Sequence, residues 1–167
     1  MGIGFRIKIF IINKTDVRKI YLLLIIFLLF AVIANAQNVN VNPGAGSYPT
    51  VKAAFDAINA GTHIGSITIN ITGSTTETAS AILNASGTGA SSYTSISISP
   101  SGGVPRTSSG NLAAYFIDLD GADNVTIDGL NTGGNSLTIS NTAKGTVSTI
   151  RFMADASNNT ITNCTIK

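Results

Sequence analysis

The sequence is poor in the residues that build most metal, disulfide and redox sites. Tryptophan is absent from its 167 residues, cysteine and histidine occur once each, and only 11% of the residues are charged. With Cys164 as its one cysteine, the chain cannot form an intramolecular disulfide, and no group of cysteine and histidine has the spacing of a zinc site. A phosphate-binding glycine loop is missing as well. These absences exclude the familiar signatures of zinc- and nucleotide-dependent proteins.

The few charged residues are divided unevenly along the chain. Residues 1–36 carry a net charge of +4, whereas the residues after them carry a net charge of −2. The positive charge of the whole chain therefore belongs to its first segment and does not indicate nucleic-acid binding. We expect no nucleic-acid partner.

Residues 1–36 have the pattern of a secretory signal peptide. A basic segment ends at residues 18–19, an apolar run covers 21–33, and the small-residue string Ala34-Asn35-Ala36 precedes Gln37. The alternative is an uncleaved membrane anchor, but the apolar run is shorter than the roughly 20 residues that a spanning helix needs. We predict cleavage near Ala36–Gln37, a location in the medium or at the outer cell surface, and membrane contact only through this peptide.

Residues 37–65 are predicted to hold a short strand and one amphipathic helix. The helix falls within residues 48–61, where Ser47 or Thr50 can cap its start and Gly61 can end it in the left-handed conformation. Its apolar residues recur at helical spacing and form one stripe: Val51, Ala54, Phe55 and Ile58. Such a helix needs an apolar surface to lie on.

Residues 66–167 alternate between apolar and polar residues with a period of two, which predicts short strands. Longer repeats are present as well, because Ile67 recurs as Ile96 and, after an equal interval, as Val125. The string from Ala122 to Leu130 returns, after a slightly longer interval, as the string from Ala156 to Cys164. Long intervals of this kind, with several strands in each, are typical of stacked solenoids.

We therefore predict an all-β fold, a right-handed parallel β-helix of about three coils preceded by a capping helix. Like residues then stack on like, and Asn124 over Asn158 is expected to form an asparagine ladder. A β-sandwich is the alternative, but it explains the alternation without explaining the repeated strings. The helix is expected to cover the first coil. Because nothing comparable follows the last strand, we expect the chain to be the beginning of a longer protein.

The segment Tyr48–Gly61 and the string Ile117–Gly129, which contains Asn-Val-Thr-Ile-Asp-Gly, resemble the start of pectin-lyase-like right-handed β-helix proteins. The resemblance covers about residues 43–167. It is greatest to the large secreted surface proteins of Bacteroidetes-type bacteria, which are often described as adhesins or as cargo of type IX secretion. The C-terminal sorting domain of that family has no counterpart here. The resemblance implies the fold strongly and an activity weakly.

The acidic residues of the repeat region are the best candidates for a chemical site. Asp118, Asp120, Asp123 and Asp128 offer the hard oxygen ligands that calcium prefers, and paired carboxylates also perform glycoside hydrolysis. The plainer interpretation is that they are solvated outward residues. Because Arg151 follows Asp118 by about one repeat, we expect a cross-coil ion pair between these two side chains.

The single cysteine and the single histidine are not predicted to act together. Cys164 lies in a strand-like stretch and is interpreted as a small buried apolar residue, whereas His63 lies beside a glycine-rich turn. No other catalytic residue and no cofactor is predicted, apart from the calcium candidate.

Two classes of function are left by the sequence. The first is a non-catalytic structural or adhesive surface module that contacts glycans or other extracellular surface components. The second is the N-terminal part of a polysaccharide lyase or glycoside hydrolase of the β-helix fold. Low charge and the lack of convergent acid and base groups favour the first class.

Overall fold

The computed structural model describes residues 13–14, 17–22 and 36–167. It divides into two units, Met1–Ala34 and Asn35–Lys167, and each is described by itself. In the first unit residues 17–22 are helical, while most of the predicted signal peptide, including residues 23–35, lies outside the described residues. Within the described ranges, no helix is long and apolar enough to cross a membrane.

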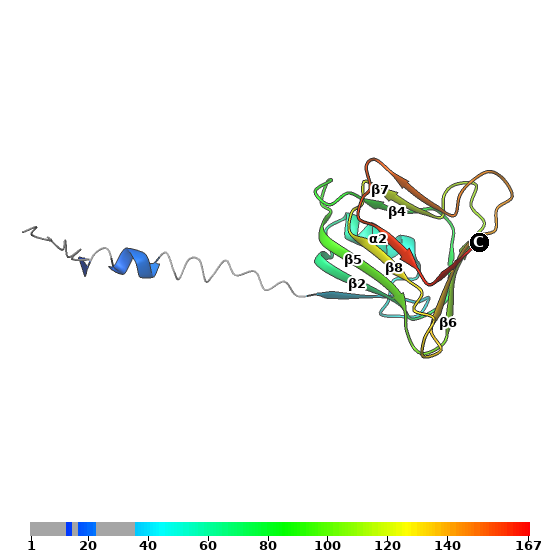
Figure 1. The fold of residues 1–167 in the computed structure, drawn as a ribbon, viewed down its shortest axis with the longest axis horizontal. Helices are drawn as coiled ribbons and strands as arrows, with labels where there is room; N and C mark the ends of the chain where they lie inside the picture. The colour runs from blue at the N-terminus through cyan, green and yellow to red at the C-terminus, as the bar shows by residue number, and fades with distance from the viewer. Residues whose placement is uncertain (1–12, 15–16, 23–35) are drawn as a thin grey trace, which may run out of the picture. The chain divides into compact units, whose positions relative to one another are not determined.

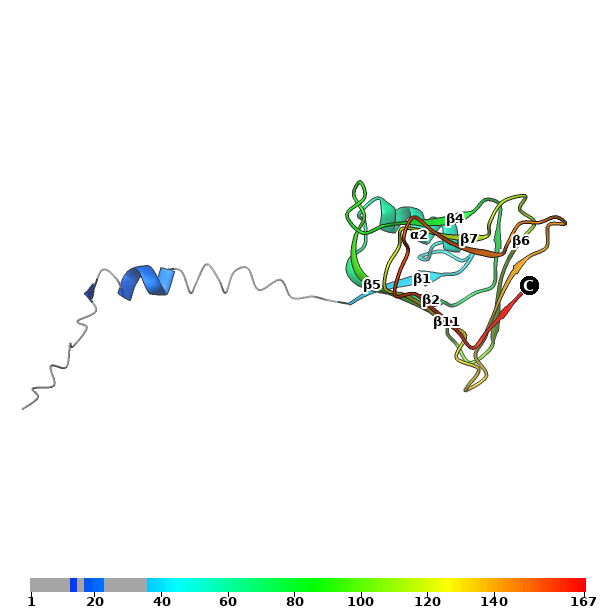
Figure 2. The same ribbon diagram turned by 45° about the horizontal axis from the view of Figure 1, so that its top comes forward.

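The second unit is a parallel β-solenoid of about four turns, whose strands form three sheets on the sides of the coil (Figures 1 and 2). The five-stranded sheet has the order β1 (Gln37–Val41), β2 (Ile64–Ile71), β5 (Ser92–Pro100), β8 (Val125–Asp128) and β11 (Thr160–Thr162). The four-stranded sheet has the order β12 (Cys164–Ile166), β9 (Ser136–Asn141), β6 (Pro105–Gly110) and β3 (Thr75–Glu77). The three-stranded sheet has the order β10 (Ile150–Met153), β7 (Ile117–Asp120) and β4 (Ala81–Asn84).

The solenoid predicted from the sequence is confirmed, and its register follows the repeats. Ile67 pairs with Ile96 and Ile96 with Val125, as the two equal intervals predict, and Thr126 pairs with Thr160 across the longer interval. The expected count of about three coils was too low. The reason is β1, which pairs in parallel with β2 along its whole length and opens the first turn.

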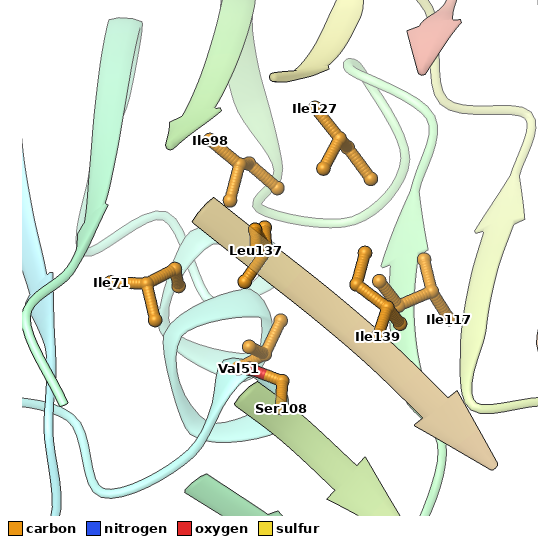
Figure 3. A pocket seen from close by; sticks show the side chains of 8 residues that line it. All are labelled: Val51, Ile71, Ile98, Ser108, Ile117, Ile127, Leu137 and Ile139. Carbon is orange, nitrogen blue, oxygen red and sulfur yellow. The ribbon is translucent and has the colours of Figure 1, made fainter. Parts of the chain in front are cut away.

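The inner face of the five-stranded sheet carries the longest stack of the core. This inner row joins one side chain from each strand in register: Val39, Ile69, Ile98, Ile127 and Ile161. Burying an isoleucine side chain contributes about 1.5–3 kcal/mol, so this row is a main source of stability. Figure 3 shows Ile98 and Ile127 with Leu137 and Ile139 of β9 around one small cavity in the interior. This cavity has a volume of about 10 Å³, which is no more than a single water molecule needs.

Helix α2 (Val51–Asn59) buries the stripe that the sequence predicts, with Val51, Ala54, Phe55 and Ile58 all buried. Thr50 is the N-cap, because its hydroxyl oxygen accepts a hydrogen bond from the Ala53 N–H at 3.0 Å. Gly61 has the left-handed φ of 73° expected of a helix end.

Helix α2 lies beside β4 and covers the first coil of the three-stranded sheet (Figure 2). The Asn59 amide fixes it there, because its nitrogen donates to the Ile82 carbonyl at 2.9 Å and its oxygen accepts from the Asn84 N–H at 3.0 Å. Two main-chain groups on the edge of β4 thus gain a partner, as the capping role predicted from the sequence requires.

A buried carboxylate joins the start of α2 to the first coil. Glu77 of β3 is 2% exposed, and its two oxygens accept the N–H groups of Val51 at 2.9 Å and Lys52 at 3.1 Å. The Thr75 hydroxyl lies 3.1 Å from Glu77 Oε1 and 3.1 Å from the Ser108 hydroxyl on β6. Negative charge is favourable at a helix N-terminus, where the first N–H groups lack a partner within the helix.

The asparagine ladder expected between Asn124 and Asn158 is wrong. Both residues have a left-handed backbone, with φ of 59° and 54°, and both side chains are exposed. The neighbouring Asn159 joins the coils instead, since its amide nitrogen donates to the Ala122 carbonyl at 2.7 Å and its oxygen accepts from the Val125 N–H at 2.9 Å. With the left-handed backbone at Asn158, its amide faces solvent, and the amide of Asn159 faces the preceding coil.

We expect Glu77→Ala to lower the free energy of unfolding by about 2–4 kcal/mol, because it leaves two helix N–H groups without a partner in a buried place. Urea denaturation of the full chain, followed by circular dichroism, measures this loss. Thr76→Ala changes the outward neighbour on the same strand and is the control, with an expected change below about 0.5 kcal/mol. Equal effects of the two variants would contradict the role given to Glu77.

Candidate functional site

The outer face of the five-stranded sheet carries an uncharged polar row that crosses all five strands. We call it the outer row, and it consists of the side chains that are in register on successive strands: Asn38, Thr68, Ser97, Thr126 and Thr160. Neighbouring parallel strands are about 4.8 Å apart, so these hydroxyl and amide groups recur at that interval. Alternation explains the arrangement, because each residue of the outer row is followed by a residue of the inner row.

The four-stranded sheet carries a shorter row of the same kind. Thr107, Thr138 and Thr165 are in register on β6, β9 and β12, and each presents a hydroxyl on the outer face. The Ser74 hydroxyl precedes them and accepts the Thr107 N–H at 3.0 Å. Two of the three outer faces of the solenoid therefore display regularly spaced hydroxyl groups.

The outer face of the three-stranded sheet holds a charge pair instead. Arg151 of β10 is in register with Asp118 of β7, and its Nε donates to Asp118 Oδ1 at 2.9 Å while Nη2 donates to Oδ2. The ion pair predicted from the sequence is confirmed. The hydrogen bonds to Asp118 raise the pKa of the Arg151 guanidinium above its ordinary value.

Asp118 is not the solvated residue that the plainer interpretation of the acidic group expected. It is only 4% exposed, because Ile82 flanks it on one side and Arg151 on the other. The Tyr115 ring stacks on the guanidinium at 4.0 Å from the ring centroid, which adds a cation–π contact. Sequence reasoning missed Tyr115, since it lies in the loop before β7 and outside the repeats.

The other three candidate calcium ligands have separate surroundings. Asp123 Oδ1 accepts from the Ser157 N–H at 2.6 Å and hydroxyl at 2.7 Å, and these bonds lower the pKa of Asp123. Asp128 Oδ1 accepts from the Asn163 amide and the Leu130 N–H, both at 2.9 Å, and these bonds lower its pKa. Asp120 is the outward residue at the end of β7.

The four aspartates are thus not brought together as one ligand set. Across residues 13–14, 17–22 and 36–167, no group of three or more His, Cys, Asp or Glu side chains is placed to hold a metal ion. Asp118, Asp123 and Asp128 each have hydrogen-bond donors from the chain itself. The calcium hypothesis therefore gains no support from the geometry and stays a prediction from the sequence.

Cys164 and His63 lie in different surroundings, as expected. The Cys164 thiol faces the Ile127 carbonyl at 3.8 Å, and burial raises its pKa, which disfavours the nucleophilic thiolate. His63 contacts Tyr48 and Gln37 beside β1. Sequence reasoning missed this polar cluster, because its members come from three separate segments.

A scan of protein-family models, a search of curated proteins and a search of solved structures each found no match to this chain.

Breaking the charge pair should affect stability asymmetrically. Arg151→Ala leaves the buried Asp118 carboxylate without its partner, whereas Asp118→Ala leaves an arginine that can turn into water. We expect the urea midpoint to fall further for Arg151→Ala than for Asp118→Ala. The double variant should lie above Arg151→Ala, and Lys144→Ala, which alters an exposed loop residue, should match the parent. A midpoint for Arg151→Ala equal to that of Lys144→Ala would refute the pairing.

The stability of the fold should fall in acid. Asp123 and Asp128 have an ordinary pKa of 3.8 and a lower pKa in the folded chain. Their contribution is therefore complete above the ordinary value and is lost as the pH falls through the lowered value. Urea midpoints measured between about pH 6 and pH 2 should drop below about pH 4.

The double variant Asp123→Asn and Asp128→Asn should have a shallower acid drop than the parent, since it has lost both titrating groups. Asn111→Ala removes an exposed, uncharged side chain and should follow the parent profile. A double variant with the slope of the parent below pH 4 would show that other groups dominate the acid response.

Proposed function

We propose that the chain is an exported, non-catalytic surface module that adheres to neutral glycans or similar extracellular surfaces through the outer row. The observation behind the proposal is the register of that row, which places five uncharged polar side chains on successive strands of one sheet. Hydroxyl and amide groups both donate and accept hydrogen bonds, as do the hydroxyl groups of a sugar chain. Export rests on the signal peptide predicted from residues 1–36.

The fixed register of the solenoid strands suits a polymer with a regular repeat. The inner row holds every strand of the sheet in one register, so the outer groups are fixed without ordering a loop. Pre-ordering lowers the entropy cost of binding, and many weak contacts along a polymer add up. A polymer with repeating hydroxyl groups meets the same interval on each strand that it crosses.

The enzyme alternative has weaker support in the described residues. Glycoside hydrolysis uses two carboxyl groups about 5–9.5 Å apart, with one free to give a proton and the other to take part at the sugar. Asp118 is tied to Arg151, and Asp123 to Ser157. Arg106, a second candidate for a basic group, donates to the Ser101 carbonyl from Nε and Nη2. Because these charged groups are hydrogen-bonded within the chain, they support adhesion better than acid–base catalysis.

The triple variant Thr68→Val, Thr126→Val and Thr160→Val tests the proposal. Valine keeps the shape and strand preference of threonine while removing the hydroxyl groups, so the fold should persist. We expect the full chain to be retained by immobilised neutral polysaccharides such as cellulose, xylan and mannan, and the triple variant to lose at least about tenfold in affinity. Pull-down isotherms measure the loss.

The matched control is Thr107→Val, Thr138→Val and Thr165→Val, which removes three hydroxyl groups from the four-stranded sheet. This variant should bind like the parent. Adhesion through the five-stranded sheet would be refuted if the control lost as much affinity as the test variant, or if the parent bound no surface. Release of sugars from the polysaccharides during the assay would favour the enzyme alternative.

A further inference from the structure

A polar groove lies at the outer edge of β1. It is open to solvent, has a volume of about 360 Å³, and is lined by Asn38, Val39, Asn40, Gly46, Ser47, Tyr48 and His63. Ligand clefts in proteins have volumes of about 300–1,000 Å³ and a few fixed polar groups. The lining contains no aspartate, glutamate, lysine or arginine.

The loop after β1 builds the groove by turning back along the strand. The Tyr48 N–H donates to the Asn40 carbonyl at 2.9 Å, and the Asn42 N–H donates to the Tyr48 carbonyl at 2.9 Å. Gly46 permits the turn with its φ of 77°. The tyrosine ring is thereby held beside the strand.

Hydrogen bonds then hold the Tyr48 and His63 rings against each other. Gln37 Oε1 accepts from the Ile64 N–H at 3.3 Å, and it lies 3.0 Å from His63 Nδ1. Because this oxygen can only accept, Nδ1 is the donor to it, and the Tyr48 hydroxyl lies 2.8 Å from Nε2. The two rings meet edge to face with centroids 5.6 Å apart. Tyr48 thus has its position set by contacts within the chain.

Other groups in the groove are unused. Within the described part of the chain, the Asn38 amide and the Ser47 hydroxyl make no side-chain hydrogen bond, and the Asn40 amide has only a long contact of 3.4 Å with Asn70. The groove therefore offers free donors and acceptors around a fixed aromatic ring. Asn38 is also the first residue of the outer row, so the groove and the row are continuous.

We propose that this groove is a binding subsite for a neutral sugar residue at the end of the outer row. A sugar ring has an apolar C–H face that fits against the Tyr48 ring, and hydroxyl groups that fit the free amides and Ser47. Because the lining has no lysine or arginine to pair with the carboxylate of an acidic sugar, it favours neutral sugars. This inference rests on the proposed function, since it gives the glycan a place to be anchored.

An extended peptide that adds a strand to β1 fits the groove less well. Strand addition needs a run of free main-chain groups on the sheet edge. On this edge Tyr48 already occupies the Asn40 carbonyl and the Asn42 N–H. The side chains of the groove thus offer more to a ligand than the main chain does.

The single histidine makes a direct test possible. The imidazole signals of His63 in nuclear magnetic resonance spectra are unique in the full chain, and they report on the groove alone. Titration with cellohexaose should shift them in a saturable manner, while an oligogalacturonate of equal length, which is acidic, should shift them at least about tenfold less effectively. A stronger response to the acidic sugar, or a response only to an extended peptide of Thr and Val, would overturn the proposal.

Variants separate the ring from the amide. Tyr48→Ala should abolish the saturable shift, and Asn38→Ala, which changes an exposed side chain, should weaken binding at least about fivefold without touching the His63 network. Asn111→Ala, an exposed asparagine outside the groove, should bind like the parent. If Asn38→Ala also binds like the parent, the groove is not the subsite, whether or not Tyr48→Ala folds.

The failure of this inference differs from the failure of the proposed function. Unchanged His63 signals with cellohexaose, together with loss of polysaccharide binding in the triple threonine variant, would remove the groove and keep the adhesive row. Saturable His63 shifts together with an unaffected triple variant would keep the groove and remove the row.

Discussion

The contact between Glu77 and the start of α2 is the constraint on which the first coil depends. A solenoid end exposes apolar interior and strand edges, and α2 covers both, provided that its own N-terminal N–H groups find partners. Glu77 supplies these partners from inside the coil, and Thr75 and Ser108 continue the polar contacts toward the next turn. The buried Glu77 side chain therefore joins α2 to the first coil, on which the apolar residues of the later coils stack. The apolar stripe of α2, which includes Phe55 and Ile58, is buried against that first coil.

Stacking in register transfers this order to the outer surface. Each inner side chain that packs on its equivalent in the next coil fixes the position of its outward neighbour, so the inner row and the outer row are two consequences of one pairing. A slip of one residue would bring threonine and serine inside and isoleucine outside, at a large cost in buried apolar area. The regular spacing of the outer hydroxyl groups is thus enforced by the core and needs no contacts of its own.

The sequence predicted the contacts that follow from repeats and from helical spacing. It missed the contacts between segments that are far apart in the chain and share no repeat. The intervals between repeated strings were enough for the register and for the Asp118–Arg151 pair, and helical spacing was enough for the buried stripe of α2.

Glu77 has no counterpart in the other coils, so no repeat indicates that it turns inward beneath a helix. The cluster of Gln37, Tyr48 and His63 joins residues from β1, a turning loop and the start of β2, and only the folded chain brings them together. The asparagine ladder failed because a left-handed backbone, unlike an extended one, decides which of two adjacent amides faces the next coil.

The electrostatic arrangement of the solenoid is consistent with the neutral partner that we propose. Asp118 is paired with Arg151 and Lys52 with Asp56, while Asp123 and Asp128 are held by hydrogen bonds from neighbouring polar groups. Charges that are paired or hydrogen-bonded within the chain give little long-range attraction to a charged ligand, and salt screens what is left. In the proposed function, affinity comes from short-range hydrogen bonds and apolar contact, for which the outer row and the Tyr48 ring are the candidates. Such contacts are weak one by one, so the proposal favours a long polymer that meets several coils at once over a short ligand.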